Sequence, residues 1–304
     1  MRDDTCSIEC SHGTMEQYID REHLRKIKGH PCFSKEAQHR FGRIHLPVAP
    51  KCNIKCHYCV RRYDCVNESR PGVTSQVLTP TEALDRVQEV VARFNNIRVV
   101  GIAGPGEPLA NEETFETFRL LRKTLPYLQF CVSTNGLLLT EKLDLISDLG
   151  ISTITVTMNA IDPSIGNQIY SWVRYRGKYL RGLKAAKLLL SNQLAGIKGA
   201  VERGLVVKVN SVMIPSINDK HLVEVAKKAR ELGVYMQNIM PLIPQDKFAY
   251  LSPPDPAERK EVQDTCATIT RQMRHCRQCR ADAVGLLNQD LSTTLAQPPR
   301  LDKG

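Results

Sequence analysis

Three cysteines in one short stretch are the residues of this chain whose types and spacing could do chemistry. Cys52, Cys56 and Cys59 form the pattern C-x3-C-x2-C. Three thiolates this close together can hold three irons of a cubane cluster and leave its fourth iron open for a substrate. Structural zinc instead prefers paired C-x2-C knuckles and four protein ligands. The spacing therefore favours a 4Fe-4S cluster over zinc.

The chain has eleven cysteines, which is a high and odd number for an intracellular protein. Thiols stay reduced inside cells, and clustered cysteines there bind metal more often than they form disulfides. The cysteines outside the triad are Cys6 and Cys10 in the N-terminal arm, Cys32 and Cys65 on either side of the triad, Cys131, and the terminal group Cys266, Cys276 and Cys279. Together with the triad, these cysteines supply enough thiol groups for three clusters.

Length and composition indicate one soluble catalytic domain with two extensions. The 304 residues, 42% of them apolar, can bury one large core. No window holds the roughly 18 uninterrupted apolar residues that a membrane span needs. The N-terminus also lacks the basic and apolar blocks of a signal peptide. We expect a cytoplasmic protein without a membrane partner.

The net charge of +10 does not by itself indicate a nucleic-acid partner. The basic residues gather in the acid-free stretch 163–201 and around the terminal cysteine pair, and a single Trp provides no interleaved aromatic platform. A cubane held by four thiolates carries a charge of about −2, which nearby cations stabilise. Anionic clusters and a carboxylate are therefore the favoured partners, and a solvated helix face is the alternative for individual lysines.

Short β-branched runs alternate with amphipathic segments along the chain. The runs are 45–49, 98–103, 130–134, 153–158, 206–214 and 235–240. The first helix has a complete start signal, with Thr79 as N-cap, Pro80 at its first position and Glu82 closing a capping box. Further helices are expected near 111, over 140–150, after 178, over 220–232 and from 256. This alternation predicts a parallel sheet with helices outside it.

In parallel barrels the reactive groups gather at the C-terminal ends of the strands. The triad follows the first predicted strand, and the segment Gly104–Glu107 follows the second. At the ends of the next three strands stand Ser133, Thr134 and Asn135, then Asn159, then Ser211 or Asn210. These positions are the first candidates for a site.

Two motifs in this order resemble those of the radical S-adenosylmethionine (SAM) enzymes. Tyr58 directly precedes the third cysteine, and Ala103–Pro108 is similar to the segment with which that family holds the methionine amine of SAM. The stretches His30–Ser34, Ile44–Cys52 and Tyr63–Val73 further resemble the nitrogenase cofactor maturases of that family, over about residues 30–282.

The resemblance implies an α/β fold of the partial (β/α)6 TIM barrel type over residues 41–250. It also implies an N-terminal extension, 1–40, with a cluster ligand, and a cluster-binding C-terminal extension, 251–285. A disordered tail is expected over 286–304, whose last part is polar and rich in proline.

The resemblance also implies site residues for SAM. The triad holds the SAM-binding cluster, and Glu107 accepts a hydrogen bond from the SAM amine, although Glu107 can also be read as an ordinary cap. The other expected SAM contacts are Tyr58, Gly104, Gly106, Thr134, Asn135, Asn159 and Asn210. The last two asparagines could equally cap turns.

Two precursor 4Fe-4S clusters are implied besides the SAM-binding one. Cys32 and Cys65 hold the first, with His45 as the preferred further ligand and His30 as the reserve. Cys276 and Cys279, with Cys266, hold the second. Cys131 is either a ligand shared between clusters or a small buried hydrophobe. Glu68 and Arg70 are candidates for a proton relay or a cluster contact, and Cys6 and Cys10 stay unassigned.

The function implied by the resemblance is cofactor maturation. The enzyme fuses two 4Fe-4S clusters and inserts a carbide from a SAM methyl group, which gives an 8Fe-9S-C precursor of the nitrogenase cofactor. The implied partners are SAM, an iron-sulfur donor, an electron donor and a separate carrier or scaffold, since the chain stops soon after Cys279. The alternatives are another radical SAM enzyme with auxiliary clusters, such as a peptide maturase, a non-catalytic iron-sulfur scaffold, and a zinc-stabilised binding protein.

Overall fold

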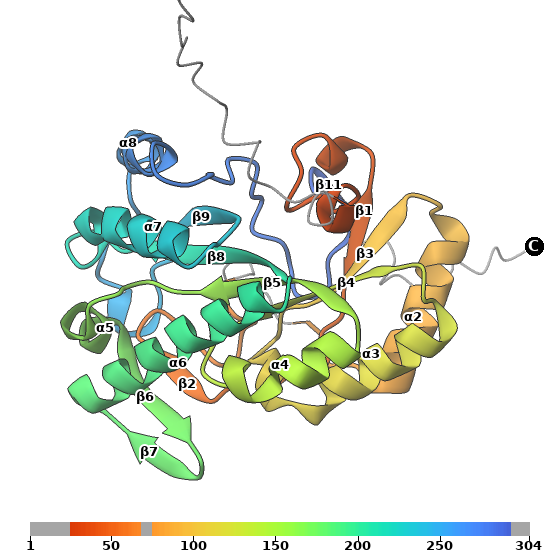
Figure 1. Ribbon diagram of the computed structural model, residues 1–304, viewed down its shortest axis with the longest axis horizontal. Coiled ribbons are helices and arrows are strands. Elements are labelled where there is room, and N and C mark those ends of the chain that lie inside the picture. Colours follow the sequence, from red (N-terminus) through yellow and green to blue (C-terminus); the bar gives the residue numbers. More distant parts are fainter. Residues whose placement is uncertain (1–24, 68–74, 293–304) are drawn as a thin grey trace, which may run out of the picture.

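The β-branched runs of the chain form one eight-stranded sheet in the computed structural model, which describes residues 25–67 and 75–292 (Figure 1). Six neighbouring strands are parallel: β1 (Gly42–His45), β3 (Ile97–Ile102), β4 (Gln129–Thr134), β5 (Ile151–Thr157), β8 (Val206–Met213) and β9 (Met236–Pro241). The sheet curls into a half barrel, and the expected partial (β/α)6 barrel is confirmed.

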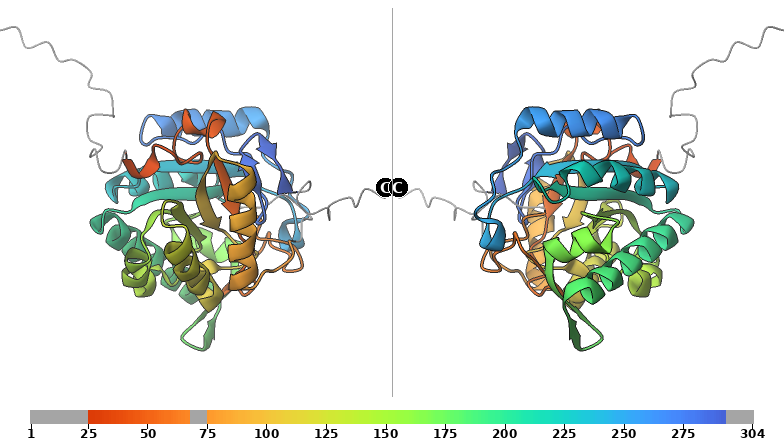
Figure 2. Two further views of the ribbon diagram at one scale, coloured as in Figure 1. Left: turned by 90° about the vertical axis from the view of Figure 1, so that its right-hand side faces the viewer. Right: turned by 90° about the vertical axis from the view of Figure 1, so that its left-hand side faces the viewer.

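Helices cover the outside of the curled sheet, as the two side views in Figure 2 show. They are α2 (Pro80–Arg93), α3 (Glu112–Thr124), α4 (Leu139–Asp148), α5 (Pro163–Ile169), α6 (Gly182–Glu202), α7 (Leu222–Glu231) and α8 (Pro256–Ala267). The predicted capping box of α2 is present, because the Thr79 side chain accepts from Glu82 N while Thr79 N donates to Glu82 Oε2. Of these helices the sequence pattern missed only α5, which is short.

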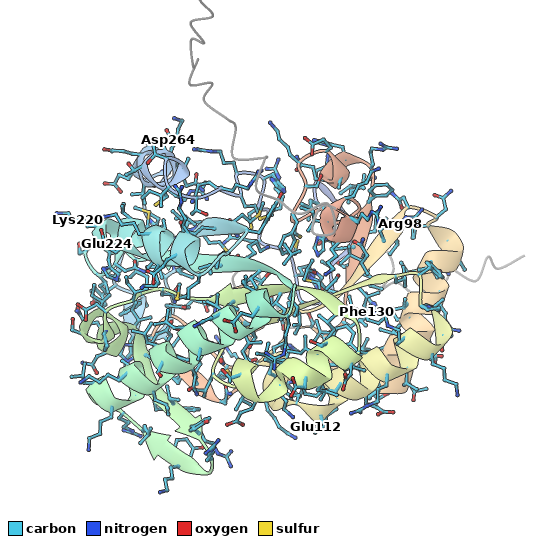
Figure 3. The ribbon with its side chains drawn as sticks, viewed as in Figure 1. Arg98, Glu112, Phe130, Lys220, Glu224 and Asp264 are labelled. Atoms are coloured by element: carbon cyan, nitrogen blue, oxygen red, sulfur yellow. The ribbon has the colours of Figure 1, made fainter. Side chains whose placement is uncertain are left out.

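The core lies between the sheet and these helices. Phe130 of β4, labelled in Figure 3, is fully buried and packs against Phe118 of α3 with ring centroids 5.2 Å apart. Val100 and Ile154 of the neighbouring strands belong to the same cluster. Each such side chain stabilises the fold by about 1.5–3 kcal/mol through burial.

The first strand begins and ends earlier than the predicted 45–49. Regular pairing stops after His45, because Pro47 has no N–H to donate to the ladder. The segment nevertheless stays beside β3, since Ala49 N donates to Gly104 O at 3.1 Å. Residues 46–49 therefore lead straight from the sheet edge into the triad loop.

A second, antiparallel sheet went unpredicted. It consists of β2 (Ile54–Cys56), β6 (Tyr170–Tyr175) and β7 (Lys178–Leu180). Arg176 and Gly177, with φ of 47° and 77°, join β6 to β7 through the positive φ angles of a two-residue hairpin turn. Because β2 carries Cys56, this sheet supports the triad loop.

The C-terminal extension joins the main sheet instead of ending in a tail at residue 286. Strands β10 (Val284–Leu286) and β11 (Gln289–Asp290) form a hairpin, and β10 pairs with β1. Arg43 fixes this edge by donating to the carbonyls of Gly285 and Leu286 at 2.7 and 2.8 Å. The predicted tail was therefore placed too early, and its remainder, 293–304, lies outside the described residues.

In the described residues, no helix has the length and apolar character of a membrane span.

Candidate functional site

The three triad cysteines line one cavity at the C-terminal ends of the strands. Cys56 ends β2, and Cys59 N donates to Cys56 O at 3.2 Å, which folds the loop back on itself. Lys55 and Arg61 brace this loop: Lys55 Nζ pairs with Asp246 at 2.7 Å, and Arg61 donates to Pro50 O at 2.7 Å. Cys65 lines the same cavity, so four thiols share one enclosure.

Burial governs the chemistry of these thiols. It raises the pKa of Cys52 to about 11, and it raises the pKa values of Cys56 and Cys65 well above the ordinary thiol value. Neighbouring thiols add to these shifts, because two adjacent thiolates repel each other. A cationic metal centre removes both costs by binding the thiolate forms, so this donor set fits an iron-sulfur cluster.

The Gly-Glu segment is clamped against the triad loop. Gly106 N donates to Ala49 O at 2.6 Å, and Glu107 N donates to Lys51 O at 2.8 Å. A Cβ at residue 106 would stand 2.3 Å from Lys51 O, so only glycine permits this approach. Gly104 lies nearby, and a Cβ there would be 3.9 Å from Cys65 Cβ.

Glu107 is buried and faces the triad cavity. Its carboxylate accepts from Thr134 Oγ1 at 2.5 Å, from Asn135 N at 2.7 Å and from Leu109 N at 3.0 Å. Burial raises its pKa to about 7, although these hydrogen bonds act to lower it. A cation placed in the cavity would favour the ionised carboxylate. The alternative interpretation of Glu107 as a cap also holds, because it precedes the short helix η3 (Pro108–Ala110).

Tyr58 and Asn159 lie behind the cavity and do not line it. Asn159 Nδ2 donates to the hydroxyls of Tyr58 and Tyr170 at 2.7 and 3.2 Å, and its Oδ1 accepts from Val212 N at 2.8 Å. Tyr58 in turn donates to Asn67 at 3.0 Å. Both ends of the Asn159 amide are therefore used inside the fold, and its expected contact with SAM stays a prediction.

A second cavity opens beside the first, deeper in the half barrel. Asn67 and Ser133 line both cavities, so the two are neighbours. Its candidate metal ligands are His30, Cys32, His45, Cys131, Cys276 and Cys279. They come from the N-terminal segment, β1, β4 and the C-terminal extension, and only the tertiary fold brings them together. No three His, Cys, Asp or Glu side chains within residues 25–67 and 75–292 converge on the position of a single metal ion.

The two histidines of this cavity differ in their hydrogen bonds. His45 Nδ1 lies 3.0 Å from Arg280 O, and because a carbonyl only accepts, Nδ1 is protonated and Nε2 keeps its lone pair. Gly101 makes room for this ring, since a Cβ there would lie 2.9 Å from His45 Cδ2. His30 Nδ1 instead accepts from Cys32 N at 3.2 Å, which places the proton on Nε2. His45 is thus the better prepared ligand.

The structure separates Cys32 and Cys65, which were expected to hold one cluster together. Cys65 lines the triad cavity and Cys32 the second cavity. Asn210 also lines the second cavity and not the triad cavity, and its expected contact with SAM stays a prediction. Cys266 is buried in the core and lines neither cavity. Its Sγ lies 3.6 Å from Leu222 O, between α8 and α7. Neither cavity supports its predicted role as a third terminal ligand, and that role stays a prediction.

Two cations of the second cavity were missed in the sequence. Arg43 is 1% exposed and donates to Cys279 Sγ at 3.2 Å, and Lys208 is 5% exposed with Nζ 5.2 Å from the centre of the Phe33 ring. A charge in the middle of an apolar strand, as at Lys208 in Val206–Val209, was the available signal. Glu68 and Arg70 lie outside the described residues.

Comparison with known proteins places this geometry in a family. The radical SAM superfamily model matches residues 46–244. The chain is 47% identical over 296 residues to the FeMo cofactor biosynthesis protein NifB of Frankia alni, and 47% identical over 294 residues to that of Azotobacter vinelandii. In both cases 94% of the chain is covered, and the chain spans 58% of the length of the relative.

Solved structures agree on the fold. Streptococcus suis SuiB bound to S-adenosylmethionine matches with a TM-score of 0.54 and 14% identity, covering 83% of this chain and 53% of that one. A radical SAM methyltransferase from Sphaerobacter thermophilus matches with a TM-score of 0.54 and 17% identity, covering 76% of this chain and 64% of that one. The superfamily match spans the strands from β3 to β9 together with the triad and Glu107, and the chain belongs to the radical SAM superfamily.

Proposed function

We propose that the triad cavity binds a 4Fe-4S cluster through Cys52, Cys56 and Cys59 and binds SAM beside it. The observation that carries this proposal is that the three thiols and the Glu107 carboxylate line one enclosure. When bound, the cluster supplies the electron that splits the sulfonium of SAM. A site inside the half barrel suits this chemistry because it limits the access of water to reactive species.

The chain's own residues position SAM in this proposal. Glu107 accepts a hydrogen bond from the SAM amine, and the amine's positive charge stabilises the ionised carboxylate. Thr134 and Asn135 fix the direction of the carboxylate through the hydrogen bonds described above. Gly106 holds this acid next to the triad loop.

We further propose that the second cavity binds precursor 4Fe-4S clusters as substrates. Cys32, Cys276 and Cys279 supply thiolates, and His45 supplies the lone pair of Nε2. Arg43 and Lys208 compensate the negative charge of such substrates. Cys131 of β4 lies at the same cavity and is a further ligand. Cys65, on the triad side, is placed to contact a cluster that reaches toward SAM.

The proposed reaction is the fusion of two precursor clusters around a carbon from a SAM methyl group. Two 4Fe-4S clusters supply eight irons and eight sulfurs, so an 8Fe-9S-C product needs one more sulfur from another source. The relatives named NifB support this proposal. The shared walls of the two cavities support it independently, because a methyl donor bound in one would be a neighbour of clusters bound in the other. An iron-sulfur donor, an electron donor and a product carrier are the proposed partners, and Glu68 and Arg70 remain candidates for proton transfer.

Anaerobic reconstitution with iron and sulfide, followed by incubation with methyl-labelled SAM, tests the proposal. We expect about twelve irons per chain, release of 5′-deoxyadenosine under reduction, and label in the metal product. The triple variant Cys52→Ala, Cys56→Ala, Cys59→Ala is the control, and it should lose about four irons and all SAM cleavage. About four irons in the wild type would leave a radical SAM enzyme of another kind, and absence of SAM cleavage would reduce the chain to a scaffold.

A further inference from the structure

A wide groove lies behind the second cavity, between the N-terminal segment and the chain that follows α8. Its volume is about 960 Å3, against about 40 Å3 for the second cavity in this form of the protein. Both segments lie at the upper side of the sheet in Figure 1, away from α6. The groove belongs to neither site described above, and it is large enough to receive part of another molecule.

The groove and the second cavity share their walls. In the N-terminal segment, Cys32 lines the cavity while the next residue, Phe33, lines the groove. In the C-terminal segment, His275 lines the groove while Cys276 lines the cavity. His275 Nε2 lies 3.1 Å from Pro31 O and joins the two segments. A molecule in the groove is therefore one residue away from two thiols proposed to hold a substrate cluster.

The rim of the groove is strongly basic. The exposed cations on it are Arg25, Lys28, Lys35 and Arg274, and Arg271 is half-buried beside them. Glu36 is the one acid among the lining residues that the structure describes. Arg274 is paired with Asp264 of α8, labelled in Figure 3, at 2.6 Å. No ion pair within the described ranges engages Lys28 or Lys35.

The floor of the groove is apolar and aromatic. Phe33 and Met236 are buried there, and Tyr235 is half-buried with the Arg271 guanidinium 5.2 Å from its ring centre. Aromatic residues, Met and Arg are the types enriched in protein interfaces, where an aromatic floor receives an anchoring side chain. A groove that binds a free anion would need only the cations of the rim and not the aromatic floor.

We propose that this groove is the docking surface for an acidic protein that carries an iron-sulfur cluster and hands it to the adjoining cavity. The cationic rim attracts an acidic surface, the aromatic floor fixes it, and the shared wall brings its cluster to Cys32 and Cys276. Charge complementarity of this kind acts mainly on the rate of association. This inference rests on the proposed function of the second cavity.

The test uses a defined probe, a 4Fe-4S cluster held by a short cysteine-containing peptide flanked by glutamates. The comparison probes are the same peptide with glutamines in place of the glutamates, and the free thiolate-ligated cluster. Transfer to the 304-residue chain is followed by stopped-flow absorbance at low and high salt. The groove variant is Lys28→Glu with Lys35→Glu. The matched control is Lys184→Glu with Lys187→Glu on α6, which changes the net charge equally at exposed positions.

For the glutamate peptide at low salt, we expect at least about a tenfold slower transfer to the groove variant and less than about a twofold change for the control. Salt should remove the difference, because it screens exposed charges. The final iron content should be the same in all three proteins. If the groove variant accepts the cluster as fast as the wild type, or if the control slows equally, the docking proposal is wrong.

Two further outcomes separate the alternatives. Equal slowing with the free cluster and with the peptide would mean that the groove admits a bare anion, which overturns protein docking. Residues 1–24 contain six acids against two arginines and are another possible occupant. Faster transfer after those six acids are replaced by amides in the full chain would assign the groove to them instead. A wild type that holds only about four irons would refute the proposed function itself, whatever the rates.

Discussion

Replacing Gly106 with alanine tests whether the contact between the Gly-Glu segment and the triad loop builds the site. The new Cβ would lie 2.3 Å from Lys51 O, 2.7 Å from Lys51 C and 2.8 Å from Pro50 O. Ordinary contact begins near 3.4 Å, so the two segments must separate by about 1.1 Å, which is 3.4 minus 2.3. The clashing atoms are backbone, and no side chain can rotate away to relieve them.

Such a separation breaks the hydrogen bonds from Gly106 N to Ala49 O and from Glu107 N to Lys51 O. Each of these two bonds contributes about 0.5–1.5 kcal/mol. Overpacking adds about 1–3 kcal/mol. We therefore expect Gly106→Ala to lower the free energy of unfolding by about 2–6 kcal/mol and to displace Glu107 from the triad.

Urea unfolding of the cofactor-free protein measures the first effect, and SAM cleavage by the reconstituted protein measures the second. Gly29→Ala is the control, because a Cβ at residue 29 meets nothing closer than 3.8 Å. Its effect should stay within about 1 kcal/mol. If Gly106→Ala unfolds like the control and cleaves SAM normally, the clamp between the two loops does not organise the site.

Four further substitutions test other parts of the structure. The pKa of Glu107 is raised from 4.5 to about 7, so the native state keeps a proton that the unfolded state loses between these values. The free energy of unfolding should therefore fall by about 3 kcal/mol as the pH rises from 4.5 to about 7. Glu107→Gln should lack this fall in urea unfolding at pH 5 and pH 7.5, and equal pH dependence in both proteins would contradict the assignment. Cys266→Ala should bind as much iron after reconstitution as the wild type, whereas Cys276→Ala should lose about four irons. The reason is that only Cys276 lines the second cavity. Loss of iron from Cys266→Ala would show that Cys266 is a ligand. Asn159→Ala should cost about 2–4 kcal/mol in the same unfolding assay, since three buried hydrogen bonds are lost, and a neutral effect would show that they are replaceable.

Much of the site was predictable because its parts are local in sequence. The triad spacing, the Gly-Glu segment and the capping box of α2 each depend on residues fewer than ten positions apart. The six parallel strands follow from β-branched runs, and the strand-end rule then placed Glu107 and Thr134 at one edge. The structure joins those two side chains by a 2.5 Å hydrogen bond.

Other features depend on contacts between distant segments, which no local pattern encodes. Cys276 and Cys279 reach the cavity of Cys32 and Cys131 only because the C-terminal extension folds back along the half barrel and adds β10 to β1. The C-x2-C spacing indicated ligands but not their partners. Cys266 is also a cysteine and lies only ten residues before Cys276, yet its position on α8 directs its side chain into the core.

The amino-acid sequence by itself determined the class of fold and the chemistry of the triad, because strand propensity, helix caps and ligand spacing act over a few residues. Only the tertiary structure decided that Cys65 belongs with the triad and Cys32 with the second cavity. It also decided that the Asn159 amide is hydrogen-bonded inside the fold and that Arg43 and Lys208 line the same cavity as Cys32, Cys276 and Cys279. The physical reason is that burial and long-range packing exist only once the half barrel has formed around these side chains. Burial shifts the pKa of a thiol, and packing occupies the hydrogen bonds of an amide.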